Sequence, residues 1–174
     1  MAFPLSGIKV LDMSRVLAGP FAGRMLSDLG ADVVKLEPPE GDVTRHWGRK
    51  VGDVSGYFNQ QNSGKRNVCV DLSDKQGVEL VKSMVGVCDV LIENFRPDVM
   101  VRFGLDYDTL SAINPRLIML SISGFGADNP DSRRAAYAPI IHAETGLVAR
   151  QSAITGAFPT ELPLSVADTN AGMQ

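Results

Sequence analysis

The chain has 174 residues, of which 44% are hydrophobic and 21% charged, a composition typical of a folded globular domain and not of a disordered segment. Seventeen Lys and Arg against 20 Asp and Glu give a net charge of -3, which gives no sign of generic nucleic-acid binding. No run of about 18 apolar residues is present to span a membrane. With roughly 100–200 residues expected per domain, we expect one domain over residues 1–174.

Cysteine and histidine usage excludes two further kinds of structure. The two cysteines, Cys69 and Cys88, cannot form a disulfide framework, and because both stand in apolar stretches we expect buried free thiols. His46 and His142 have no second His or Cys at ligand spacing, so no metal site is expected. The N-terminal stretch shows no signal-peptide pattern, and we expect a cytoplasmic protein.

Short apolar strands and helix-length stretches alternate along the first part of the chain. Strands are predicted at residues 7–13 and 32–36. Between them, residues 21–29 carry apolar side chains at i, i+4 and i+8, the spacing of a buried helix stripe. Gly30 follows this stretch and is well placed to end the helix.

The middle of the chain is less regular. Residues 40–64 are polar and have no clear period, a length that is uncommon in a compact domain unless the segment is functional or partly helical. Alternation then predicts a strand at 66–72, followed by a helix with Ser73 as candidate N-cap that ends near Gly86.

The remaining elements complete a repeating pattern. Strands are predicted at 89–92 and 117–122, separated by a short helix at 107–113. Strands that alternate with helices indicate βαβ units and hence a parallel sheet. The sequence therefore predicts a Rossmann-like α/β domain with helices on both faces of the sheet.

Three segments are expected to meet where a parallel sheet binds its ligands, beyond the carboxyl ends of the strands. They are SRVLAGPFAG at 14–23, ENFRP at 93–97 and SGFG at 123–126. The first lacks the GxGxxG spacing, so NAD binding is not supported. It is either a tight strand-to-helix turn or a ligand-binding loop.

Basic side chains accompany these segments. Arg96 and Arg102 could bind phosphates through bidentate hydrogen bonds, or they could mark a solvated basic helix start. The pair Lys65 and Arg66, before the third strand, has the same two interpretations.

Asp168 is the candidate for covalent chemistry. This residue follows an apolar run, stands at the start of an expected helix and has small residues around it. Asp168 is either the helix N-cap or a carboxylate nucleophile that a substrate approaches closely.

Taken together, these segments resemble the class III CoA-transferases. The matching stretches run in order from PLSGIKVLDMSRVLAGPFAG through NSGKRNVCVDL and DVLIENFRPDVMVRFG to VADTNAGMQ, and they cover nearly the whole chain. The resemblance implies the CoA-binding large domain of such an enzyme. It also implies an acyl-CoA donor and a carboxylic acid acceptor as substrates, without a permanently bound cofactor.

The resemblance also implies roles for individual residues. Asp168 would attack the donor thioester and pass through aspartyl anhydride and aspartyl-CoA intermediates, and Tyr137 would lie near the reacting thioester. The residues implied to contact CoA are Val16, Leu17, Ala18, Val70, Asp71, Leu72, Ser73, Asn94, Phe95, Arg96 and Arg102.

Two departures from the family pattern concern the acyl site. Formyl-CoA transferases have Gln in place of Leu17 and Glu in place of Ala138, so we expect an acid larger or less charged than formate or oxalate. Racemases of the family have a His–Asp pair in place of Tyr137 and Ala138, and racemisation needs an acid and a base on opposite faces of the reacting carbon. CoA transfer is therefore the favoured function. Racemase activity and a non-catalytic CoA-binding domain are the alternatives.

The resemblance extends to the assembly. Family members are much longer, continue into a small second domain and form interlocked homodimers, whereas this chain ends six residues after Asp168. We therefore expect the N-terminal part of such an enzyme, inactive alone. We also expect residues after about 150 to be poorly ordered or packed against another chain.

Overall fold

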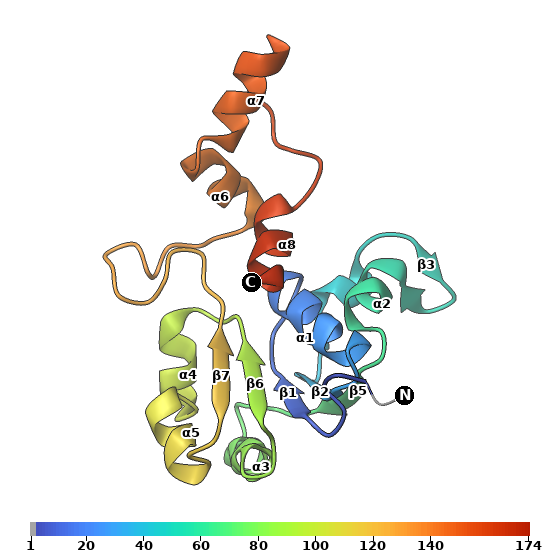
Figure 1. The fold of residues 1–174 in the computed structure, drawn as a ribbon, viewed down its shortest axis with the longest axis vertical. Coiled ribbons are helices and arrows are strands. Elements are labelled where there is room, and N and C mark those ends of the chain that lie inside the picture. Colours follow the sequence, from blue (N-terminus) through green and yellow to red (C-terminus); the bar gives the residue numbers. More distant parts are fainter. Residues whose placement is uncertain (1–2) are drawn as a thin grey trace.

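A computed structural model describes residues 3–174 as a parallel sheet with helices on both faces and a helical extension above its carboxyl edge (Figure 1). The five strands pair in the order β5-β2-β1-β6-β7, and every neighbouring pair is parallel. The predicted α/β class is confirmed. The strands are β1 (Lys9–Asp12), β2 (Asp32–Glu37), β5 (Arg66–Cys69), β6 (Val90–Glu93) and β7 (Ile118–Ser121).

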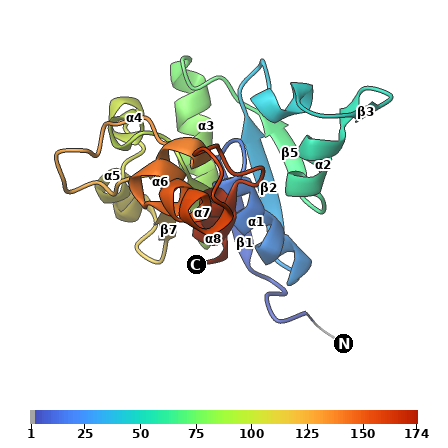
Figure 2. The same cartoon turned by 90° about the horizontal axis from the view of Figure 1, so that it is seen from above.

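The helices form three groups around the sheet (Figure 2). One face is covered by α1 (Ala18–Asp28). The opposite face is covered by α3 (Lys75–Val85), α4 (Pro97–Phe103) and α5 (Tyr107–Ile113). The extension above the carboxyl edge consists of α6 (Ala138–Glu144), α7 (Leu147–Thr155) and α8 (Val166–Met173).

Alternation along the strands divides the core between the two faces. In β1, Val10 belongs to the cluster under α1, whereas its neighbour Leu11 belongs to the cluster under α3, α4 and α5. Both side chains are at most 2% exposed. Because successive strand residues point to opposite faces, β1 contributes to both clusters.

The polar stretch 40–64 contains short elements instead of one long loop. These are a 3-10 turn, η1 (Val43–His46), a hairpin of β3 (Lys50–Val51) and β4 (Val54–Ser55), and the helix α2 (Gly56–Asn62). The expectation that this stretch is partly helical is confirmed.

Two local predictions are wrong. The N-cap of α3 is Asp74, whose side chain accepts a hydrogen bond from the Gln76 N–H at 2.9 Å, while Ser73 donates to Asp71 instead. Cys69 is exposed, because it lies on the edge strand β5; Cys88 is buried as expected, and both thiols are free.

The end of the chain folds back onto the sheet domain. The connector of residues 156–165 is mostly exposed, but α8 packs along α1. The end of the chain is therefore ordered at α8, and packing against another chain stays a prediction. On the α1 side of the sheet β7 stays open, with Ile118 64% and Leu120 37% exposed.

Two kinds of feature are missing from residues 3–174. No helix there combines the length and the apolar character that crossing a bilayer requires. No group of three or more His, Cys, Asp and Glu side chains is arranged to hold a metal ion.

Candidate functional site

A cavity of about 620 Å³ lies above the carboxyl edge of the sheet. Its wall is built from the loop after β1, the segment between β6 and α4, the loop after β7, and parts of α6 and α8. The segments SRVLAGPFAG, ENFRP and SGFG therefore converge as expected.

The cavity brings together seven of the residues predicted to form the site. Asp168 and Tyr137 contribute to its wall from α8 and from the N-cap of α6. The other five come from the β1–α1 loop and the end of β6: Val16, Ala18, Asn94, Phe95 and Arg96.

The remaining predicted residues do not line this cavity. Leu17 is buried, and Val70 and Leu72 pack in or against the core under α3. Arg102 is exposed and forms an ion pair with Asp98 at 3.5 Å. Asp71 and Ser73 are exposed at the turn that precedes α3.

Asp168 lies in the first turn of α8 but is not its N-cap, which is Ser165. Its side chain is half-buried, and this burial raises the pKa of the carboxyl above its ordinary value. A main-chain hydrogen bond to the carboxyl lowers the pKa and partly offsets burial, and the first-turn position also favours the carboxylate. The nucleophile interpretation therefore has geometric support that the N-cap interpretation lacks.

His142 contacts the start of α8. This residue of α6 is 2% exposed, and its Nε2 accepts a hydrogen bond from the Ala167 N–H at 3.1 Å. An accepting Nε2 requires a neutral imidazole with its proton on Nδ1. Among the described residues that Nδ1 has no hydrogen-bond partner. No local sequence signal identifies this contact, because it joins residues 25 positions apart.

A close helix contact joins the two sides of the site. Gly172 of α8 lies against the first turn of α1, where a Cβ on this glycine would stand 2.5 Å from the Ala18 carbonyl oxygen and 3.1 Å from the Phe21 ring. Glycine is therefore required for this approach. The contact holds the helix that carries Asp168 against the helix that begins at Ala18.

Arginine side chains give the cavity a cationic wall. Arg134 is engaged by Glu144 and, at 3.5 Å, by Asp131. Arg15 and Arg96 also line the cavity, and neither forms an ion pair within residues 3–174. Guanidinium groups of this kind bind phosphate oxygens through paired hydrogen bonds. Arg15 was not among the predicted residues.

The basic pair at 65 and 66 does not face this cavity. The Lys65 Nζ is buried and donates to Asp12 at 2.7 Å, to the Pro20 carbonyl at 2.7 Å and to Asn62 at 2.9 Å. Burial lowers the pKa of Lys65, and the negative charge of Asp12 partly offsets this effect. Arg66 instead forms an exposed ion pair with Asp32 at 2.6 Å.

A second residue that the sequence did not reveal is Tyr57 of α2. Burial raises the pKa of its hydroxyl, and the negative charges of Asp168 and Asp42 raise it further. The phenol therefore stays protonated near the candidate nucleophile and keeps its capacity to donate a hydrogen bond.

Two curated CoA-transferases and a family profile match this chain. The sequence profile of CoA-transferase family III matches residues 5–174. A succinate–glutarate CoA-transferase from Agrobacterium fabrum is 43% identical over 98% of this chain, which spans 44% of that protein. An acetyl-CoA:oxalate CoA-transferase from Acetobacter aceti is 43% identical over 96% of this chain and 42% of its own length.

Solved structures agree with the sequence relatives. A CAIB/BAIF family protein from Brucella suis superimposes with a TM-score of 0.91 and 40% identity, over 99% of this chain and 47% of that one. The chain thus spans less than half the length of each of these relatives. Because the family profile covers almost all of its length, the chain belongs to CoA-transferase family III.

Proposed function

We propose that the protein moves CoA from an acyl-CoA thioester to a free carboxylic acid, with Asp168 as the covalent nucleophile. The observation that carries the proposal is the Asp168 carboxyl on the wall of a cavity that Arg15 and Arg96 also line, neither of which has an ion pair in the described part of the chain. Burial makes this carboxylate more basic and hence a better nucleophile than an exposed one. Family membership supports the same reaction.

In the first half-reaction an Asp168 oxygen attacks the thioester carbonyl. The C–S bond breaks, CoA leaves as a thiolate, and the acyl group stays on Asp168 as a mixed anhydride. The thiolate then attacks the aspartyl carbonyl of this anhydride. The donor acid leaves as its carboxylate, and CoA is held as an aspartyl thioester.

The second half-reaction is the reverse with another acid. The acceptor carboxylate attacks the aspartyl thioester and displaces the CoA thiolate, giving a second anhydride. Attack of the thiolate on the acceptor's acyl carbon forms the new acyl-CoA and restores the Asp168 carboxylate. Each step exchanges one activated acyl bond for another, so no external energy source and no net proton transfer are needed.

The CoA contacts divide between the cavity and the surface beside it. Arg15 and Arg96 would bind phosphate oxygens, while Val16, Ala18 and Phe95 supply apolar contacts for the pantetheine arm or the adenine ring. Asn94 and Tyr137 complete this wall. The residues outside the cavity, Leu17, Val70, Asp71, Leu72, Ser73 and Arg102, remain predictions for the rest of the CoA molecule.

The acyl site is proposed to take an acid larger than formate or oxalate. Ala138 lines the cavity without a polar group, and Leu17 is buried outside the cavity wall. The relative named for succinate and glutarate supports a longer acid, whereas the relative named for oxalate would predict the opposite. Comparing succinate, glutarate and oxalate as acceptors decides between them, and a clear preference for oxalate contradicts the proposal.

Replacement of the nucleophile tests the reaction. In the purified whole protein, Asp168→Asn should abolish exchange of labelled CoA between acids but leave CoA affinity within about threefold, because the binding wall stays intact. Hydroxylamine should convert the aspartyl thioester to a hydroxamate at residue 168 in the unmodified protein only.

Asp108 provides the matched control, because it also lies in the first turn of a helix but far from the cavity. Asp108→Asn should transfer CoA normally. Undiminished transfer by Asp168→Asn would overturn the covalent mechanism. CoA binding without any exchange in the unmodified protein would favour a non-catalytic binding domain instead.

Racemisation has less support from the geometry. His142 is buried, and its Nε2 is already engaged by the Ala167 N–H. The ring therefore does not offer its basic nitrogen to a substrate in the cavity.

A further inference from the structure

The turn between β1 and α1 holds a valine in a conformation that valine rarely adopts. Val16 has a φ of 70°, and it is the one residue other than glycine with positive φ among residues 3–174. A β-branched side chain is strained in this left-handed region. Such a conformation persists only where neighbouring groups over-determine it, and Val16 lies directly on the cavity wall.

One side of this turn is held by Asn94. Its Oδ1 accepts a hydrogen bond from the Arg15 N–H at 2.7 Å, and its Nδ2 donates to the Arg15 carbonyl at 2.7 Å. The Asn94 amide thus hydrogen-bonds both the N–H and the carbonyl of Arg15, the same two groups that a paired strand would engage. A residue that the sequence assigns to CoA contact therefore fixes the backbone of a different wall residue.

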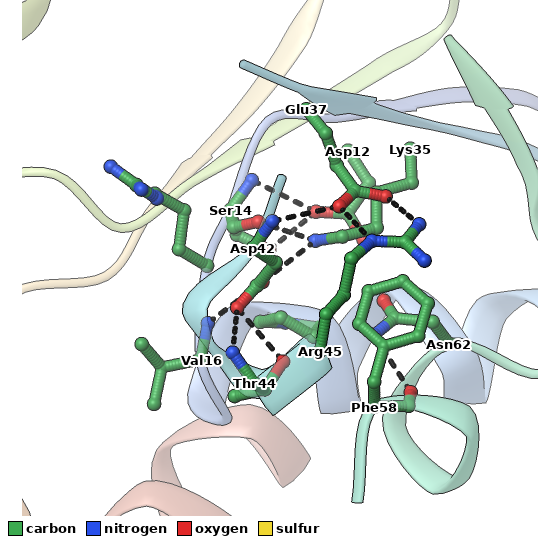
Figure 3. Close-up of polar contacts among 12 residues, drawn as sticks. Asp12, Ser14, Val16, Lys35, Glu37, Asp42, Thr44, Arg45, Phe58 and Asn62 are labelled. Carbon is green, nitrogen blue, oxygen red and sulfur yellow. Dashed lines mark hydrogen bonds and ion pairs between the residues drawn. The ribbon is translucent and has the colours of Figure 1, made fainter. Parts of the chain in front are cut away.

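The other side is held by a buried ion pair of Lys35 and Asp42 (Figure 3). The Lys35 Nζ donates to the Ser14 carbonyl at 2.8 Å and lies 3.2 Å from Asp42 Oδ2. The same Oδ2 accepts the Val16 N–H at 3.1 Å. The side chains of Lys35 and Asp42 are 1% and 0% exposed, so water does not compete for these bonds.

The Asp42 carboxylate is itself fixed in place. Its Oδ1 accepts from the N–H and the hydroxyl of Thr44, at 3.0 and 2.8 Å, and its main-chain N–H donates to Glu37 at 2.8 Å. These bonds and the positive charge of Lys35 lower the pKa of Asp42 despite the opposing effect of burial. Removing two charges from water is costly, so a pair like this is weak evidence for stability alone.

We propose that Lys35, Asp42 and Asn94 are positioning residues that hold the Ser14–Val16 turn in its binding conformation, so that ligand affinity at the cavity depends on a buried ion pair that touches no ligand. The inference rests on the proposed function, because it takes the ligand of the cavity to be CoA. It predicts a specific dependence: a residue that adopts positive φ without strain at position 16 makes the ion pair dispensable.

The test combines Asp42→Asn with Val16→Gly. Asp42→Asn alone should raise the KM for acyl-CoA about tenfold and leave kcat within about threefold, because the turn and not the nucleophile is displaced. Adding Val16→Gly should return KM close to that of Val16→Gly alone. A merely structural role predicts a lower melting temperature with unchanged KM, or additive effects in the double variant, and either result overturns the proposal.

Two further measurements keep the test decisive. Asp32→Asn removes an exposed ion pair with Arg66 and should leave KM unchanged. This variant controls for the loss of one acidic side chain and one ion pair near β2. If Asp42→Asn does not fold, Lys35→Met is judged by the same criteria, because it removes the other partner of the ion pair and its hydrogen bond to the Ser14 carbonyl.

A direct readout separates this inference from the proposed function. In isotopically labelled protein, the amide shift and the HN–Hα coupling of Val16 report its φ without any substrate. Loss of the positive φ in Asp42→Asn supports the positioning role even if no CoA transfer is detected. A retained positive φ overturns it even if CoA transfer is established.

Discussion

The titration of Asp168 should appear directly in the pH dependence of the reaction. Burial raises the pKa of this carboxyl above its ordinary value of 3.8, and only the ionised form attacks a thioester. The rate constant kcat/KM should therefore be constant near neutral pH and fall on the acid side with an apparent pKa above 3.8. An apparent pKa at or below 3.8 on the acid side of the kcat/KM profile would contradict the burial of the nucleophile.

The two thiols should differ sharply in reactivity. Burial, with the nearby charge of Asp89, raises the pKa of Cys88 from 9.0 to about 11, whereas Cys69 is exposed. At pH 8 only about one Cys88 in a thousand is a thiolate, by the difference between pH and pKa. Iodoacetamide should modify Cys69 and leave Cys88 free in peptide mass spectra of the native protein. Equal labelling before unfolding would show that Cys88 is accessible.

At the level of single elements, the contact between α8 and α1 can be tested at Gly172. Gly172→Ala places a methyl group against the Ala18 carbonyl, so we expect a loss of about 1–3 kcal/mol in unfolding free energy from overpacking. CoA transfer should fall as well, because the same displacement moves Asp168. Thermal unfolding and the exchange assay measure the two effects.

The matched control for this change lies on the same helix. Asn170 is exposed, and Asn170→Ala should change stability by less than about 0.5 kcal/mol and leave transfer intact. An unchanged melting temperature in Gly172→Ala would mean that α8 does not depend on its close approach to α1.

The elements that the sequence revealed are those whose signal is local. Short apolar patterns located all five strands of the parallel sheet, because each strand contributes at least one apolar side chain to a core cluster or against it. The first turn of α1 was missed because Gly19 and Pro20 are typical of loops. Proline is tolerated in a first turn, and Gly19 is needed because a Cβ there would stand 2.2 Å from Ser14.

The parts that the sequence did not reveal depend on contacts between distant segments. No pattern near His142 indicates that its ring accepts a hydrogen bond from α8, and none near Lys35 indicates its pairing with Asp42. Asp168 was singled out by the resemblance to a family, since the residues alone also allowed an N-cap. Cys69 was misjudged because apolar neighbours do not reveal that a strand lies at the sheet edge.

For the molecule as a whole, exposed apolar side chains of α7 and of the connector that follows it support the homodimer that the family resemblance implies. Ile154, Phe158 and Leu164 are 72%, 84% and 69% exposed. Burying one such side chain contributes roughly 1.5–3 kcal/mol, which is tenfold or more in a dissociation constant. Phe158→Ser should therefore weaken a dimer at least about tenfold in sedimentation equilibrium.

The control for this measurement is an equally exposed apolar residue elsewhere. Val87 is 67% exposed and follows α3, a helix that lies at the opposite end of the molecule from α7 (Figure 1). Val87→Ser should leave the dissociation constant unchanged. A monomeric wild-type protein at all concentrations would contradict the proposed dimer.

The packing of α8 on α1 also decides where the chain tolerates changes in length. The hydrogen bond from the Ala167 N–H to His142 fixes the start of α8, and the close contact of Gly172 with α1 fixes its last turn. The exposed connector of residues 156–165 therefore does not determine where the helix lies. The entropy of closing a flexible loop grows only slowly with its length. Insertions in this connector, including a reporter peptide or a protease site, should therefore leave the Asp168 carboxylate at its position on the cavity wall.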